Sequence, residues 1–123
     1  MDIVDEIGWR LGVLASRAAQ ERYMVNATRD EYLLIEEAVN DALAIGEQRL
    51  LQAMDHRTRD PVSRFLVVLR AEMNNLDSLP RMPWPETALE NRSVAVIRSA
   101  ARACLAEIGF DLAEWERSEG YAA

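Results

Sequence analysis

Residues 60–76 read DPVSRFLVVLRAEMNNL, and this stretch decides the class of fold. Asp60 followed by Pro61 is a typical helix start, with aspartate at the cap and proline at the first helical position. Apolar residues then recur every three or four positions, which is the spacing of one face of an α-helix. Because Val67 and Val68 extend the apolar surface nearly all round, we expect this helix to be the most buried one.

Other segments repeat this helical spacing, and none shows the sustained alternation typical of a β-strand. We expect one helix over about 2–23 and a second, very long one over 28–56, opened by a capping box at Thr28. A further helix is predicted over 87–108, where a glycine stops it, and a short one over 111–120. Short connections between long helices favour antiparallel neighbours. The sequence therefore predicts an all-α fold, a four-helix up-and-down bundle with a short additional C-terminal helix, as a single helical domain.

The composition bounds the class of protein. The chain has 123 residues with 14 basic and 21 acidic side chains, which give a net charge of −7 at pH 7. Half of the residues are apolar, which excludes a disordered chain, and no apolar stretch approaches the roughly twenty residues of a membrane-spanning helix. The start is acidic where a signal peptide is basic, so we expect a cytoplasmic protein. All basic residues are arginine and alanine occurs 18 times. This pattern is typical of GC-rich genomes, so we expect a bacterial or phage source.

Few residues are suited to metal binding or covalent catalysis. The single histidine and single cysteine exclude tetrahedral zinc and the usual di-iron site of helical bundles. Cys104 is predicted on the apolar side of its helix, where a free thiol behaves as a small hydrophobic group. Glu36, Glu37 and Asp41 lie one helical turn apart, either as ligands for Mg²⁺ or, more commonly, as a solvated acidic face. We therefore expect no metal and no cofactor.

Arg49 and His56 are the best candidates for an enzyme. Seven positions apart on one predicted helix, they project from nearly the same side, and an arginine that holds a phosphate beside a histidine that moves a proton suits RNA cleavage. The segment RLLQAMDH over 49–56 resembles the Arg-x(4 to 6)-His signature of HEPN ribonucleases, which are also small helical bundles. In the alternative, Arg49 pairs with a neighbouring carboxylate and His56 closes the helix, where a cation is favourable.

Acidic residues are concentrated in the second predicted helix. Residues 28–56 carry seven acidic and two basic side chains, and Glu37 and Asp41 lie on its polar face. An acidic helix face attracts basic protein surfaces and repels nucleic acid. We therefore expect a protein partner with a basic surface and no direct nucleic-acid binding. The alternative is a solvated face that keeps the chain soluble.

The first predicted helix carries a second apolar face at Trp9 and Val13, roughly opposite its main one. Between the two faces runs a ridge of small side chains, formed by Gly8, Gly12, Ala15 and Ala19. Such a ridge lets another helix approach closely. The partner helix belongs either to this chain or to a second copy, and the second case predicts a homodimer.

Residues 79–85 read LPRMPWP, and their prolines favour an extended segment that holds Met82 and Trp84. A rigid extended segment with an aromatic tip is a good recognition element, because it loses little entropy on binding. In the alternative, the segment is a lid over the end of the bundle with Trp84 buried, which is the usual position of a tryptophan.

These patterns favour a non-enzymatic protein–protein interaction module of adaptor, immunity-protein or inhibitor type. The residues expected to contact a partner are Trp9, Val13, Glu37, Asp41, Met82 and Trp84. Two alternatives stay open: a ribonuclease or hydrolase that uses Arg49 and His56, and a small-ligand-binding regulator, which needs a cavity between helices.

Overall fold

The computed structural model describes residues 2–121, with Gln48 by its backbone only, and in this range it contains helices and no strand. The α-helices are α1 (Ile3–Ala15), α2 (Arg17–Gln20), α3 (Ile35–Leu43), α4 (Gln48–Gln52), α5 (His56–Glu72), α6 (Arg92–Ile108) and α7 (Leu112–Ser118). The predicted all-α class is confirmed. Within the described residues, no helix is both long enough and apolar enough to cross a membrane.

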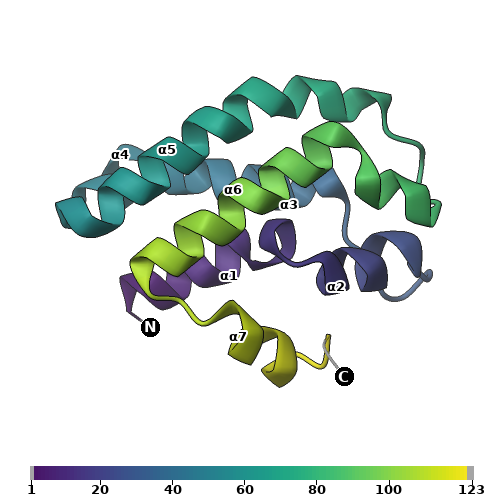
Figure 1. Cartoon of the computed structure of the whole chain (residues 1–123), viewed down its shortest axis with the longest axis horizontal. Coiled ribbons are helices and arrows are strands. Elements are labelled where there is room, and N and C mark those ends of the chain that lie inside the picture. The colour runs from purple at the N-terminus through teal and green to yellow at the C-terminus, as the bar shows by residue number, and fades with distance from the viewer. Residues whose placement is uncertain (1, 122–123) are drawn as a thin grey trace.

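The core lies between α1, α3, α5 and α6. The two longest helices, α5 and α6, pack side by side, α1 packs on α6, and α3 contacts both α1 and α5 (Figure 1). Phe65, Leu66 and Leu69 of α5 are buried as the periodicity predicts. The expectation that this helix is the most buried is wrong, because α1 buries six of its thirteen residues and α5 six of seventeen. Val67, with 66% of its surface exposed, lies on a solvent-facing side of α5.

The start of α5 also differs from the prediction. Asp55 and not Asp60 is the cap, since its carboxylate accepts a hydrogen bond from the Thr58 N–H at 3.0 Å. This bond lowers the pKa of Asp55. Pro61 is consequently inside the helix, where the missing N–H leaves the carbonyl of Arg57 without its helical donor. That carbonyl belongs to the exposed first turn.

The single long helix predicted over 28–56 is wrong. Thr28 Oγ1 accepts from the Glu31 N–H at 3.0 Å as in a capping box, but the Thr28 N–H also donates to the Glu31 carbonyl at 2.9 Å. This pair of bonds closes a turn instead of opening a helix, and the helical path begins only at α3. A 3₁₀ turn at Ala44–Gly46 then separates α3 from α4. A regular up-and-down four-helix bundle is not confirmed.

The helix predicted over 2–23 breaks at Ser16, which caps α2 by accepting from the Ala19 N–H at 3.0 Å. Because the helix breaks here, the last backbone carbonyls of α1 no longer accept hydrogen bonds from N–H groups one turn later. The buried Gln20 replaces them, because its Nε2 donates to the carbonyls of Val13 at 3.0 Å and Leu14 at 2.9 Å. The chain after α2 continues as a π-helical turn over Glu21–Val25.

The C-terminal third follows the prediction more closely. Residues 86–90 form a 3₁₀ turn, so α6 starts at Arg92 and not at 87. Gly109 ends α6 with a φ of 84°, in the left-handed region that favours glycine. Asp111 caps α7 through the Glu114 N–H, as its sequence pattern predicts.

Candidate functional site

A large hollow lies between residues 27–36 and 76–84, and we call it the loop groove. Its volume is about 740 Å³. These two segments meet at the end of the molecule farthest from α4, at the right of Figure 1. The hollow is open on one side, so a ligand or partner segment reaches it without a change of fold.

Hydrogen bonds to one short stretch position both walls of the loop groove. The Leu33 N–H donates to the Tyr23 carbonyl at 3.3 Å, and the Trp84 N–H donates to the Met24 carbonyl at 2.7 Å. The π-helical turn that contains Tyr23 and Met24 therefore fixes the distance between the two loops. The Met82–Pro83 peptide bond in the second wall is cis.

Apolar side chains dominate the interior of the loop groove. Ile35, Leu76 and Trp84 are buried beneath it, while Tyr32 and Leu34 are 53% and 39% exposed. Exposed apolar side chains that lie together often mark an interaction site, and here two of them line the same hollow.

Charged side chains of both signs flank the loop groove: Arg29, Arg81, Glu36 and Asp77. None of the four takes part in an ion pair among residues 2–121. All four are exposed and are available to a partner. The rim is thus electrically balanced, in contrast to the chain as a whole.

A smaller hollow of about 120 Å³ continues the loop groove along α3. The two hollows share Ile35, Glu36, Leu76 and Asp77 in their walls, and the smaller one extends to Val39 and Met73. The two hollows together reach from the loops onto α3, which suits a chain segment better than a compact molecule.

Of the residues predicted to meet a partner, Met82 and Trp84 line the loop groove. Met82 is half-buried, and Trp84 is only 3% exposed, so it forms the floor and is not an exposed aromatic tip. The lid interpretation therefore describes the position of Trp84 better than the recognition interpretation. Tyr32 and Leu34 were not predicted as partner-binding residues, because the sequence pattern places them inside one long helix. The run Tyr32 to Ile35 is continuously apolar, a signal that does not fit an amphipathic helix at this point.

The predicted acidic residues lie elsewhere on α3. Glu37 and Asp41 are exposed but do not line the loop groove. The backbone of α3 approaches α1 near Asp41, where Arg10 donates to the Asp41 carbonyl at 3.3 Å. Glu36, one position earlier, is the acidic residue of α3 that reaches the groove.

Arg49 and His56 are not on one helix, which corrects that expectation. The first belongs to α4 and the second begins α5, because the chain leaves its helical path before Asp55 caps the next helix. Both side chains are exposed, and neither lines the loop groove.

The ridge of small residues on α1 packs within the chain. A Cβ atom at Gly8 would lie 2.1 Å from the Phe110 ring, and one at Gly12 would lie 2.7 Å from the Trp115 ring. A side chain at either position would have to displace a ring, because Phe110, which follows α6, and Trp115 of α7 occupy this side of α1. Val13 is half-buried against the core, whereas Trp9 remains 53% exposed.

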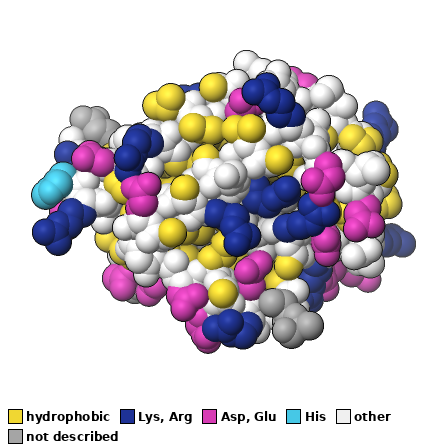
Figure 2. All heavy atoms as spheres, in the orientation of Figure 1, with side chains coloured by type: hydrophobic (Ala, Val, Ile, Leu, Met, Phe, Trp, Pro, Cys, Tyr) yellow, Lys and Arg dark blue, Asp and Glu magenta, His cyan; other side chains and the backbone are white. Residues whose placement is uncertain are grey.

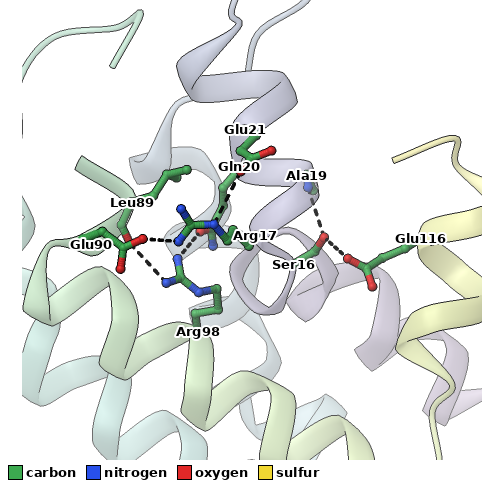
Figure 3. Close-up of polar contacts among 9 residues, drawn as sticks. All are labelled: Ser16, Arg17, Ala19, Gln20, Glu21, Leu89, Glu90, Arg98 and Glu116. Carbon is green, nitrogen blue, oxygen red and sulfur yellow. Dashed lines mark hydrogen bonds and ion pairs between the residues drawn. The ribbon is translucent and has the colours of Figure 1, made fainter. Parts of the chain in front are cut away.

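A polar network joins the Ser16 break to the rest of the fold (Figure 3). Arg98 of α6 donates to Gln20 Oε1 at 2.8 Å and to the Leu89 carbonyl at 3.1 Å, while Ser16 donates to Glu116 of α7 at 2.6 Å. Partial burial, together with neighbouring arginines, lowers the pKa of Arg98. Figure 2 shows arginine side chains near the middle of the face where α6 lies in front, although the chain is acidic overall.

Cys104 is buried, as predicted from its place on the apolar side of its helix. Burial, with a smaller contribution from the nearby Glu107, raises the pKa of this thiol to about 12. The thiolate is the reactive form, so Cys104 is unsuited to nucleophilic chemistry near neutral pH.

Comparison of the chain with protein-family models, with curated proteins and with solved structures gives no match. A function is therefore inferred from the geometry of this molecule alone.

Proposed function

We propose that this chain is a small non-enzymatic protein–protein interaction module, of adaptor, immunity-protein or inhibitor type, whose loop groove receives an apolar segment of a partner protein. The observation that carries the proposal is the open hollow of about 740 Å³ in which Tyr32 and Leu34 remain exposed. Aromatic residues in a partly buried apolar setting are the usual anchors of protein interfaces.

The shape and charge of the loop groove favour a chain segment over a small ligand. Its volume alone would suit either, since small-molecule pockets measure about 300 to 1,000 Å³. The smaller hollow extends it along α3, and the charges of both signs at its rim match a segment that carries both signs. The experiment below also distinguishes a partner segment from a small ligand, and binding of small ligands alone would indicate a small-molecule regulator.

The net charge of −7 supports a partner protein with a basic surface. Exposed carboxylates such as Glu37 and Asp41 raise the encounter rate with a basic protein surface and oppose direct nucleic-acid binding. The cytoplasm is the compartment in which we propose that this occurs. A homodimer remains part of the proposal, and the mass of the purified chain, measured by light scattering at low and high salt, tests it directly.

Selection of a randomised peptide library on the full-length chain tests the proposed function. We expect enriched peptides to share apolar residues at regular spacing and to perturb the backbone amide signals of residues 27–36 and 76–84 in NMR spectra. Tyr32→Ala should weaken an enriched peptide about tenfold, as truncation of an anchor residue does.

Val67→Ala is the matched control, because it removes an exposed apolar side chain on α5 outside the loop groove. It should leave the affinity unchanged. Peptides whose signals map outside the groove, or equal losses in both variants, would refute the proposal. A library that yields nothing, while apolar small molecules shift the same amide signals, would favour the ligand-binding alternative.

A further inference from the structure

A second hollow of about 410 Å³ lies between the first half of α1 and α7, and we call it the Trp9 groove. Three aromatic side chains line it, from Trp9, Phe110 and Trp115. After α6 ends at Gly109, the chain turns past the first half of α1, and α7 then packs against α1 (Figure 1).

The two tryptophans of the Trp9 groove contact each other. The rings of Trp9 and Trp115 meet edge to face at 83° with centroids 6.4 Å apart. The Trp115 ring lies directly over Gly12 of α1. It also packs on the Tyr121 ring, with ring centroids 5.2 Å apart. Trp9 is thus supported on one side and keeps 53% of its surface open.

Every charged residue that lines the Trp9 groove is acidic: Asp5, Asp111, Glu114 and Glu119. Glu114 is paired with Arg117 at 2.7 Å, while none of the other three carboxylates forms an ion pair among residues 2–121. This differs from the loop groove, whose rim holds both signs. An open tryptophan beside unpaired carboxylates attracts a cation, because the ring face and the acids act in the same direction.

We propose that the Trp9 groove binds an arginine side chain of a partner protein. A guanidinium group is planar, so it stacks on an indole ring and donates to a carboxylate at the same time. The loop groove then takes the apolar part of a partner and the Trp9 groove a basic one. The two sites share no lining residue, so either assignment stands if the other fails.

Two capped peptides, identical except that one carries arginine and the other its neutral isostere citrulline, test the proposal by NMR. The chain has three tryptophans, and single Trp→Phe variants assign the indole N–H signals. We expect the arginine peptide to shift the signals of Trp9 and Trp115 and to leave that of the buried Trp84 in place. The citrulline peptide should shift none of them.

Two substitutions sharpen the test. Trp9→Ala should weaken the arginine peptide about fivefold, the scale of a partly exposed cation–π contact. Asp111→Asn should weaken it about twofold without loss of α7, because asparagine caps a helix as well as aspartate does. Raising the salt concentration should remove most of the remaining affinity.

Tyr32→Ala serves as the matched control, since Tyr32 has the same exposed fraction as Trp9 but lines the loop groove. It should leave arginine-peptide binding intact. Equal binding of the citrulline peptide, or shifts confined to Trp84, would overturn the assignment. If Trp9→Ala does not fold, the Asp111→Asn variant and the salt series decide the matter alone. Failure of library peptides at the loop groove would leave these results unaffected.

Discussion

The two grooves are built by different means. The walls of the loop groove are irregular segments held by single backbone hydrogen bonds to Tyr23 and Met24. The Trp9 groove is bounded by regular helices that touch through Gly8 and Gly12. One groove has a balanced rim and the other an acidic rim. One small helical core thus carries a loop-built groove and a helix-built groove that differ in the charges lining them.

The dependence of the loop groove on the core is tested by Trp84→Ala, the substitution with the largest expected effect. Loss of this buried ring should lower the free energy of unfolding by about 3 to 5 kcal/mol, because it leaves a cavity under the groove. Urea unfolding measures the change. A loss below about 1 kcal/mol would mean that the groove floor is not part of the core.

The link between the two grooves is tested by Gln20→Leu. The change leaves the carbonyls of Val13 and Leu14 without their donors and removes an acceptor from Arg98. We expect a loss of about 1 to 3 kcal/mol, the cost of buried polar groups without partners. In urea unfolding, an unchanged stability would show that water replaces the amide. NMR should show changes near both grooves, since the break in α1 lies between them.

A smaller effect is expected from Gly12→Ala, which disturbs the Trp9 groove alone. Overpacking against Trp115 costs about 1 to 3 kcal/mol, and the better helix propensity of alanine returns about 1 kcal/mol. Thermal unfolding should therefore show a net loss near 1 kcal/mol. A stabilised variant would contradict the close contact between α1 and α7.

The smallest effect on stability is expected from the pair Trp9→Ala and Tyr32→Ala. Both side chains are 53% exposed, so each change should alter the free energy of unfolding by no more than about 0.5 kcal/mol. Thermal midpoints check this. If only one variant is clearly destabilised, its residue belongs to the core. The groove that this residue lines is then not a free binding surface.

The sequence predicts the helix-built region better than the loop-built one, for a physical reason. The end of α6 at Gly109 and the cap of α7 at Asp111 are local signals, because each depends on neighbours within a few residues. Helical spacing also places Trp9 away from the main apolar face, and the structure leaves it exposed.

The loop groove depends on contacts that local patterns do not contain. The bond from the Glu31 N–H to Thr28 Oγ1 is the one expected at a helix start. The second bond, from the Thr28 N–H to the Glu31 carbonyl, closes a turn instead. The break at Ser16 is stabilised by Gln20 and Arg98, which are far apart in the sequence. Apolar spacing runs on through that break, so periodicity alone predicts one continuous helix.

The tight fit of α7 against α1 restricts how two copies of this chain can assemble through the first helix. Phe110 and Trp115 already fill the surface over Gly8 and Gly12. A dimer that uses this surface must therefore displace them, and the least costly replacement is the same pair of rings from the other copy. Such an arrangement is a reciprocal swap of the C-terminal segment about the turn at Gly109, in which the contacts of Phe110 and Trp115 with α1 are kept and only their chain of origin changes.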